Sequence, residues 1–390
     1  MIPFNKPHIT GKEVHYIYDA VSTGKISGNG KYTKLCQDFF EEQWSFKKTL
    51  LTTSCTDALE MCALLLDIKE GDEVIVPSYT FVSSALAFVR QGARIVFADS
   101  RPDFPGIDEN KIEELISEKT VAIVVVHYAG IACDMNKVQE IAKKYNLFIV
   151  EDAAQAIDSF FISEDGNRKP LGTIGHLSTF SFHETKNIQC GEGGLLGIND
   201  ERFVKRAEIV WEKGTNRTEF FRGEVNKYGW VDIGSSFLPS EVCAAFLYAQ
   251  LEDMQNIQNR RKQLWNRYYQ NLRILEDKKL LKLPVVHKYA TNNAHMFFVV
   301  CNNENERNDL IDCLSKNDIK SVFHYLPLHL SDYYKHKHDN RFLPNSIKFS
   351  ETLLRLPLYV ELTEQDVEKI SYLIKNYYNI TKAIINSDHL

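Results

Sequence analysis

Short runs of aliphatic and β-branched residues, separated by stretches with helical periodicity, restrict the fold of this chain more than any other feature. The runs lie at 73–76, 94–97, 121–126 and 147–150. Helices are expected around and between them at 56–66, 109–117 and 136–145. Continuous apolar runs of this length are typical of parallel strands that are buried on both faces. The alternation therefore predicts an α/β architecture built on a parallel sheet.

Polar and aromatic residues directly follow three of the expected strands. These segments are 77–81, 127–130 and 152–155. In open α/β sheets, ligands bind beyond the carboxyl ends of the strands. We therefore expect these three segments, which are distant in sequence, to meet at one site.

The pattern changes after residue 240. A long helix is expected from Ser240 onward, with its apolar side chains spaced for one buried face. Beyond it we expect strands at 296–301 and 322–325 and helices at 306–316 and 363–378. These elements predict a small α+β domain. We therefore divide the chain into a large domain at 1–240 and a linking helix with a small C-terminal domain at 241–390.

The composition favours a small-molecule partner. With 46 basic and 52 acidic residues, the 390-residue chain has a formal net charge of −6, which gives no overall attraction for nucleic acid or an anionic membrane. Its eight cysteines show no paired C-x-x-C spacing, so we expect reduced thiols in a cytosol and no metal site. The longest aliphatic run, 121–126, is too short to span a bilayer. The first residues lack the apolar segment of a signal peptide, so a cytoplasmic protein is expected.

Two residues suit an aldehyde cofactor. Lys186 lies in the run Ser-Phe-His-Glu-Thr-Lys-Asn at 181–187, and Asp152 follows the strand expected at 147–150. A lysine amine can form a Schiff base with pyridoxal phosphate (PLP), and a carboxylate can keep the pyridine nitrogen protonated so that the ring accepts electrons. Singly, Lys186 could be a surface amine and Asp152 a helix cap or an arginine partner. Their occurrence together favours the cofactor.

A phosphate group could bind at the start of the helix expected at 56–66. Cys55 and Thr56 offer free backbone N–H groups and a hydroxyl there, although an ordinary N-cap would give the same pattern. Ser181 offers a second hydroxyl, five residues before Lys186.

Two further side chains could contact the cofactor ring. Gln155 follows Asp152 by three residues and could reach the phenolic oxygen. Phe81 lies at the expected rim of the sheet and could stack on a flat ring, although core packing is the commoner role of a phenylalanine.

Taken together, these motifs resemble those of the sugar aminotransferases of the DegT/DnrJ/EryC1 group, along nearly the whole chain. The matching segments read TSCTDAL at 53–59, PSYTF at 77–81, VEDAAQ at 150–155, SFHETKN at 181–187, EGG at 192–194 and HYLPLH at 324–329. Three others are similar to the branch that makes dTDP-4-amino-4,6-dideoxygalactose: EKGTNR at 212–217, DIGSS at 232–236 and NAHMF at 293–297. The resemblance implies the PLP-dependent aspartate aminotransferase fold (fold type I), in which a large domain with a mostly parallel seven-stranded sheet precedes a small α+β domain.

The resemblance also implies roles for individual residues. Those that it places around PLP are Cys55, Thr56, Phe81, Asp152, Gln155, Ser181 and Lys186. Those that it places near the sugar are His324, Tyr325 and His329. Lys186 would form the Schiff base and shuttle protons.

A shared active site is a further implication. The loop GKISGNG at 24–30 resembles one that enters a neighbouring subunit's site, which implies an obligate homodimer. Many relatives carry GYNYR where this chain reads GSSFL at 234–238. Ser236 thus replaces an amide that usually reaches the partner's cofactor phosphate, and its shorter hydroxyl would need a bridging water.

The expected reaction follows from the same resemblance. Dehydratase members of the group carry histidine in place of the Schiff-base lysine, so Lys186 favours transamination. The implied reaction moves an amino group from L-glutamate to C4 of a dTDP-4-keto-6-deoxyhexose, for a polysaccharide such as O-antigen. Alternatives are amination at C3, the gluco-configured product, or a PLP-binding regulatory protein without turnover.

Overall fold

The structure, a computed structural model, describes residues 1–380. Its main sheet has seven strands in the order β1-β9-β8-β5-β4-β2-β3. Their bounds are β1 (Lys48–Thr52), β2 (Glu73–Pro77), β3 (Arg94–Ala98), β4 (Thr120–Val126), β5 (Phe148–Asp152), β8 (Leu177–Ser181) and β9 (Gly194–Ile198). Six of the seven strands run in the same direction, and only β9, which lies between β1 and β8, runs in the opposite direction. The predicted, mostly parallel sheet is therefore confirmed, and the four apolar runs form β2, β3, β4 and β5.

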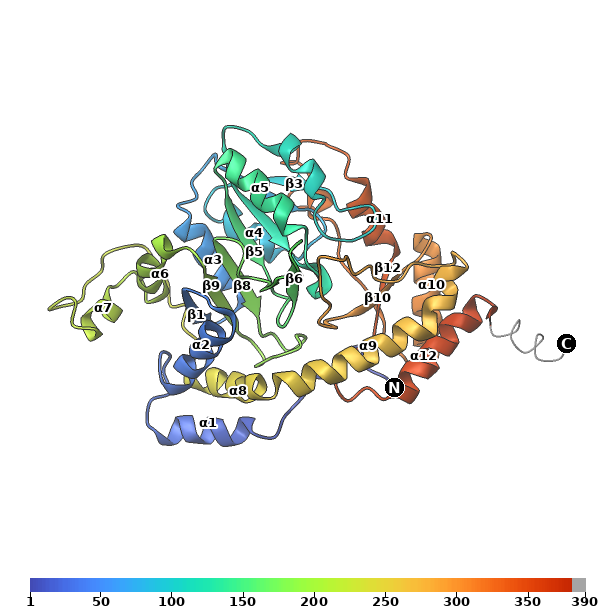
Figure 1. Cartoon of the computed structure of the whole chain (residues 1–390), viewed down its shortest axis with the longest axis horizontal. Helices are drawn as coiled ribbons and strands as arrows, with labels where there is room; N and C mark the ends of the chain where they lie inside the picture. The colour runs from blue at the N-terminus through green and yellow to red at the C-terminus, as the bar shows by residue number, and fades with distance from the viewer. Residues whose placement is uncertain (381–390) are drawn as a thin grey trace.

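Helices cover both faces of this sheet (Figure 1). One face packs against α2 (Lys31–Trp44), α5 (Met135–Tyr145) and α8 (Glu241–Glu252). The other packs against α3 (Cys55–Leu65), α4 (Ser83–Val89) and α6 (Val204–Trp211). Within β4, Ile123 and Val125 face the first layer, whereas Ala122 and Val124 face the second. Burial on both faces explains why these strands have continuous apolar sequences.

Two predicted helices differ in the structure. The helix expected at 109–117 consists of two short 3₁₀ turns, η1 (Glu109–Lys111) and η2 (Glu113–Leu115). Glu109 is buried, and its carboxylate accepts hydrogen bonds from the backbone of Asp134 and from Arg101, so tertiary contacts set the local backbone there. The long helix expected after Ser240 is divided into α8 and α9 (Met254–Asp277). The break lies at Asp253, whose backbone leaves the helical region with φ −101° and ψ 7°.

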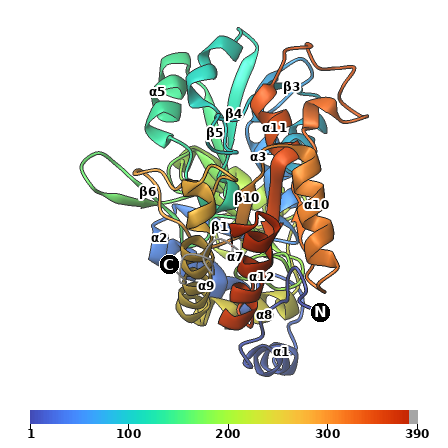
Figure 2. The ribbon, with the colours of Figure 1, turned by 90° about the vertical axis from the view of Figure 1, so that its right-hand side faces the viewer.

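The C-terminal part contains a second sheet with the order β10-β12-β11, all antiparallel. Its strands are β10 (Phe297–Val300), β11 (Val322–Phe323) and β12 (Leu353–Leu356), and its helices are α10 (Glu304–Ser315), α11 (Pro344–Thr352) and α12 (Glu364–Tyr377). Helix α9 runs from beneath the main sheet to this part, where α12 lies alongside it (Figures 1 and 2). The division at residue 240 stays a prediction, and the last ten residues of the second predicted domain lie outside the described residues.

The remaining elements are two helices, a hairpin and three short turns. They are α1 (Glu13–Ser22), α7 (Arg217–Phe221), the hairpin β6 (Phe160–Ile162) and β7 (Arg168–Pro170), and the turns η3 (Tyr128–Gly130), η4 (Glu201–Phe203) and η5 (Leu328–Leu330). None of the helices among residues 1–380 has the length and apolar character needed to cross a membrane.

Candidate active site

A cavity of about 460 Å³ lies at the carboxyl edge of the main sheet. Asp152 is the last residue of β5 and Ser181 the last of β8, so both strands deliver side chains to it. The predicted site residues that line it are Cys55, Thr56, Phe81, Asp152, Gln155, Ser181, Lys186, His324 and Tyr325. The structure thus brings together segments that are up to 270 positions apart in the chain (55 to 325).

Asp152 is the buried acidic group of this cavity, whereas Glu192, which also lines it, is exposed. Its side chain is 5% exposed, and it accepts hydrogen bonds from the Ser84 hydroxyl (2.6 Å) and the Ala154 backbone (3.1 Å). Burial raises the pKa of the Asp152 carboxyl, while Ser84, Ala154, Lys186 and His127 act in the opposite direction. A buried carboxylate with only these partners can still accept a cationic donor.

Lys186 supplies the amine. It lies in the turn between β8 and β9, where its backbone N–H donates to the His183 carbonyl (2.9 Å). Burial lowers the pKa of its amine, the charge of Asp152 raises it, and the charge of Arg355 lowers it. A lysine with a lowered pKa contains more of the neutral amine, which is the form that acts as a nucleophile or base.

The amino end of α3 forms the anion-binding part of the cavity. Ser54 caps this helix by accepting a hydrogen bond from the Asp57 backbone (3.1 Å). The N–H groups of Cys55 and Thr56 belong to the first turn and therefore have no acceptor within the helix. The Thr56 hydroxyl pairs with that of Ser83 (2.8 Å). A side chain at Gly194 would collide with the backbone of Ser54 and Cys55. Two free N–H groups, a helix dipole and hydroxyls from two segments fit a phosphate.

Gln155 and the aromatic residues form another wall. The Gln155 Oε1 accepts from the Ala129 backbone (2.7 Å), and its Nε2 lies 3.4 Å from the Tyr325 hydroxyl. Gln155 therefore has one amide N–H left for a ligand. His324 Nδ1 lies 3.0 Å from the Tyr128 hydroxyl. Burial, followed by the charges of Arg355 and Lys186, lowers the pKa of His324, so its ring is neutral near pH 7.

Phe81 leaves a large aromatic surface uncovered. Its side chain is 55% exposed at the cavity wall, and its ring centre lies 6.0 Å from that of Tyr325. Because a phenylalanine usually packs into a core, an uncovered ring here fits contact with a flat ligand.

Two predicted residues lie elsewhere. His329 is buried, bonds Ser78 through Nδ1 (2.6 Å) and is absent from the cavity wall; within the protomer it links η5 to the end of β2. Ser236 is exposed and lines a different cavity of about 900 Å³, which it shares with residues of the predicted loop 24–30. Neither placement within one protomer provides a contact with the Lys186 cavity.

Several supporting residues were not found from the sequence. Ser84 carries no motif, and only the fold brings it to Asp152. Tyr128 belongs to the segment 127–130 that was expected at the site, but its contact with His324 was not predicted. Glu151 is buried beside Asp152 and accepts hydrogen bonds from His127 (2.9 Å) and from the backbone of Gly172, Ile174 and Gly175. The sequence VEDAAQ could have indicated Glu151, because the strand residue before Asp152 must point to the opposite face of the sheet, where a buried acid needs hydrogen-bond donors.

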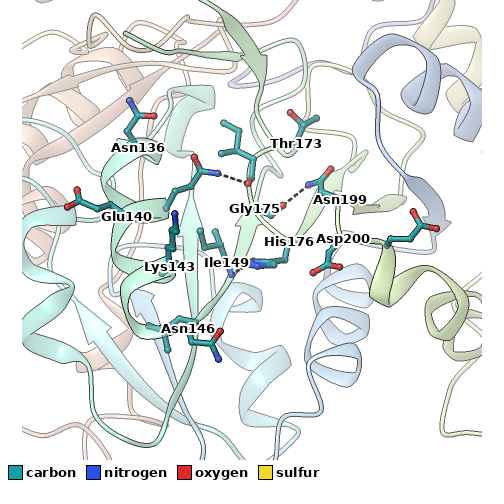
Figure 3. Close-up of a pocket in the computed structure, with 15 residues that line it drawn as sticks. Asn136, Glu140, Lys143, Asn146, Ile149, Thr173, Gly175, His176, Asn199 and Asp200 are labelled. Atoms are coloured by element: carbon teal, nitrogen blue, oxygen red, sulfur yellow. Dashed lines mark hydrogen bonds between the residues drawn. The ribbon is translucent and has the colours of Figure 1, made fainter. Parts of the chain in front are cut away.

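A larger cavity of about 960 Å³ lies at the amino ends of β5 and β8, next to the loop at 172–175 (Figure 3). Its wall includes Ile149 and His176, whose Nδ1 accepts from the Ile149 backbone (3.0 Å). Asn199 donates to the carbonyls of Gly172 and Gly175 and so fixes the loop. This is the opposite edge of the sheet from Lys186, so size does not identify the active site here.

The residues around Lys186 fit PLP. Lys186 has the amine that an aldehyde requires, Asp152 the buried acid for a ring nitrogen, and the start of α3 the donors for a phosphate. The N–H groups of Cys55 and Thr56 have no acceptor within α3, so they are free to bind the phosphate of PLP.

Comparison with known proteins agrees with this geometry. Residues 7–375 match the DegT/DnrJ/EryC1/StrS aminotransferase family. GDP-perosamine synthase of Vibrio cholerae is 30% identical over 386 residues, which cover 97% of this chain and 100% of that protein. GDP-perosamine synthase of Escherichia coli O157:H7 is 31% identical over 385 residues, which cover 97% and 99%.

Solved structures share the fold. Spr1654 from Streptococcus pneumoniae matches in its PMP-form with a TM-score of 0.87 and 27% identity, covering 96% of this chain and 98% of that one. Its PLP-form matches with a TM-score of 0.85 and 27% identity, covering 98% and 99%. The predicted fold is therefore confirmed.

Proposed function

The chain belongs to the DegT/DnrJ/EryC1/StrS aminotransferase family, and from this premise we propose that it uses PLP to transfer an amino group from L-glutamate to C4 of a dTDP-4-keto-6-deoxyhexose. The product would be dTDP-4-amino-4,6-dideoxygalactose. One observation carries the proposal: the Lys186 amine, the Asp152 carboxylate and the free N–H groups of α3 line a single cavity. Relatives solved in PLP- and PMP-forms support the choice of cofactor.

The proposed roles follow from the contacts of each residue. When bound, PLP supplies an electrophilic carbonyl and a ring that accepts electrons. Asp152 would hold the ring nitrogen, because a buried carboxylate favours a cationic partner. Cys55, Thr56 and Ser181 would hold the phosphate, and Phe81 would cover one face of the ring.

Lys186 would also move the proton. Its lowered pKa makes the neutral amine available, so Nζ would accept the proton from the α carbon of the amino donor and deliver it to the aldehyde carbon of bound PLP in the same half-reaction. In the second half of the cycle Nζ would move a proton the opposite way, to C4 of the sugar. Gln155 would orient the ring through its remaining N–H. His324 and Tyr325, which come from the C-terminal part, would contact the sugar.

The identity of the sugar nucleotide is the most specific part of the proposed function. The segments at 212–217, 232–236 and 293–297 support a dTDP-linked sugar aminated at C4. Two relatives named GDP-perosamine synthase favour a GDP-linked 4-keto sugar as the second candidate. Amination at C3 and the gluco product are the remaining alternatives.

We also propose that the active enzyme is a homodimer with shared sites. Ser236 and the loop at 24–30 line an open cavity away from Lys186, together with Lys213 and Arg217. Nearby, Trp230 is 85% exposed and Phe221 70% exposed. Large apolar side chains left uncovered around a basic cavity suit an interface that completes a neighbour's site.

The test is identification of the product. Purified enzyme with L-glutamate should convert dTDP-4-keto-6-deoxyglucose to the 4-amino-galacto product, which NMR distinguishes from the gluco and 3-amino products. Lys186→Ala should form none, because it removes the amine while the fold is retained. Faster conversion of a GDP-linked 4-keto-6-deoxyhexose would replace the dTDP assignment, and turnover by Lys186→Ala would refute the mechanism.

A further inference from the structure

Of the three residues predicted near the sugar, only His329 is not part of the wall of the Lys186 cavity. Its side chain is 3% exposed, and Nδ1 lies 2.6 Å from the Ser78 hydroxyl oxygen. The same oxygen accepts from the His329 backbone N–H (3.3 Å), and the Ser78 carbonyl accepts from the Leu328 backbone N–H (2.9 Å). Three hydrogen bonds therefore join Ser78 to two consecutive residues of η5. We call this contact the Ser78–His329 clamp.

The hydrogen bonds of Ser78 suit a neutral imidazole. Because Ser78 Oγ accepts from the His329 backbone, its hydroxyl proton is available to donate to Nδ1. Burial, followed by the charge of His338, lowers the pKa of His329 to about 4, while the charge of Asp99 raises it and that of Arg341 lowers it. The ring of His329 is therefore neutral near pH 7 and can accept this bond.

The clamp joins the main sheet to a segment without regular structure. Ser78 directly follows β2, which lies between β4 and β3 in the sheet. Residues 324–327, between β11 and η5, form neither helix nor strand. They include His324 and Tyr325, which both line the cavity. Strand β11 thus holds one end of this segment, and the clamp holds the other.

The residue after Ser78 contacts the middle of the same segment. Tyr79 is buried, and its ring centre lies 5.9 Å from that of Tyr325 and 5.7 Å from that of Tyr128. The Tyr128 hydroxyl lies 3.0 Å from His324 Nδ1. Because Ser78 and Tyr79 are consecutive, the clamp sets how His324 and Tyr325 lie against these two tyrosine rings.

We propose that His329 is a positioning residue, which holds His324 and Tyr325 in the orientation that the ketosugar requires. This inference rests on the proposed aminotransferase function, and it gives His329 no contact with the sugar. Without the clamp, both cavity side chains are present but displaced, and a displacement of about 1 Å can cost roughly 100-fold in rate. The ketosugar step should therefore suffer, whereas the glutamate step, which depends on Lys186 and Asp152, should not.

The two half-reactions separate this role from a general loss of structure. Enzyme aminated with L-glutamate is mixed with dTDP-4-keto-6-deoxyglucose, and recovery of the cofactor absorbance is followed against sugar concentration. Ser78→Ala and His329→Ala should each lower the rate per unit of ketosugar concentration about 10- to 100-fold. The reaction of the unaminated enzyme with L-glutamate should stay near the wild-type rate. His329→Asn, which keeps a polar atom near the position of Nδ1, should recover part of the loss.

A double variant distinguishes a clamp from a direct sugar contact. Ser78→Ala combined with His329→Ala should be no slower than either single variant, because both remove the same contact. Additive losses, or a loss with His329→Ala but not with Ser78→Ala, would mean that His329 acts on the sugar without Ser78. Equal losses in both half-reactions would leave the clamp with a structural role alone. Any of these results would overturn the assignment.

Two controls complete the test. His336→Ala removes an exposed histidine from the segment after η5 and should change neither half-reaction. Ser78→Ala removes a single oxygen, so it tests the clamp even if His329→Ala does not fold. If the aminated wild type reacts with neither the dTDP-linked nor the GDP-linked 4-ketosugar, the proposed function fails instead.

Discussion

Asp152 has its charge set by neighbours from several elements. Ser84 on α4 donates to its Oδ2 (2.6 Å) and is itself within 3.0 Å of the Thr80 hydroxyl. Burial raises the pKa of Asp152, and the Ser84 hydrogen bond is the largest opposing effect. Ser84 is therefore a positioning residue, because it acts on the reaction only through the carboxylate.

The pH dependence of Ser84→Ala tests this role. The reaction needs ionised Asp152, so kcat/KM should fall as the pH drops through the pKa of that carboxyl. Without the hydroxyl this pKa rises further, and the acidic limb should move to higher pH, by about one pH unit. The plateau at high pH should stay near that of the wild type. Ser371→Ala removes a buried hydroxyl without a partner in the described chain and should leave the profile in place. An unmoved limb in Ser84→Ala would show that Ser84 has no such role.

At the scale of elements, Glu241 joins α8 to the start of α2. Its buried carboxylate accepts from the backbone of Gly30 (2.9 Å), Tyr32 (2.7 Å) and Thr33 (3.1 Å) and from the Thr33 hydroxyl. These N–H groups belong to the first turn of α2, where a negative charge also stabilises the helix dipole. Gly30 is needed there because a side chain would collide with Glu241. Glu241 therefore anchors the end of the loop at 24–30.

Glu241→Gln should destabilise the fold. One accepting oxygen becomes an NH₂ group that faces other donors, and the charge is lost, so we expect a loss of about 2–3 kcal/mol. Urea unfolding would measure it. The matched control is Glu252→Gln at the other end of α8, where the carboxylate binds the exposed Lys12 and Tyr16; a loss below about 1 kcal/mol is expected. Equal losses for the two variants would contradict the anchoring role of Glu241.

At the scale of the molecule, the protomer leaves the cavity of Ser236 and Lys213 open, and the proposed homodimer would complete it. Light scattering should then give about twice the 45.0 kDa mass of the chain. Lys186→Ala and Lys213→Glu copies, each inactive alone, should regain about a quarter of the wild-type activity when unfolded and refolded together. In a mixed dimer, one site would combine an intact Lys186 with an intact partner loop. A monomeric active enzyme, or no recovery in dimers that have mixed, would contradict shared sites.

Sequence patterns determined those features in which local chemistry is sufficient. Continuous apolar runs predicted β2 to β5, because strands that are buried on both faces are apolar at successive positions. The motifs around Asp152 and Lys186 predicted residues that line one cavity. The strands β1, β8 and β9 were missed. The glycines of β9 have weak strand propensity, and all three strands are held by pairing with distant neighbours.

Only the tertiary structure decided the rest. Glu109 takes part in a buried network instead of a helix, and Asp253 divides α8 from α9. Ser84 on α4 donates a hydrogen bond to Asp152, 68 positions away in the chain. These relations depend on contacts between residues far apart in the chain, whose energies exceed the small local propensities that a sequence pattern records.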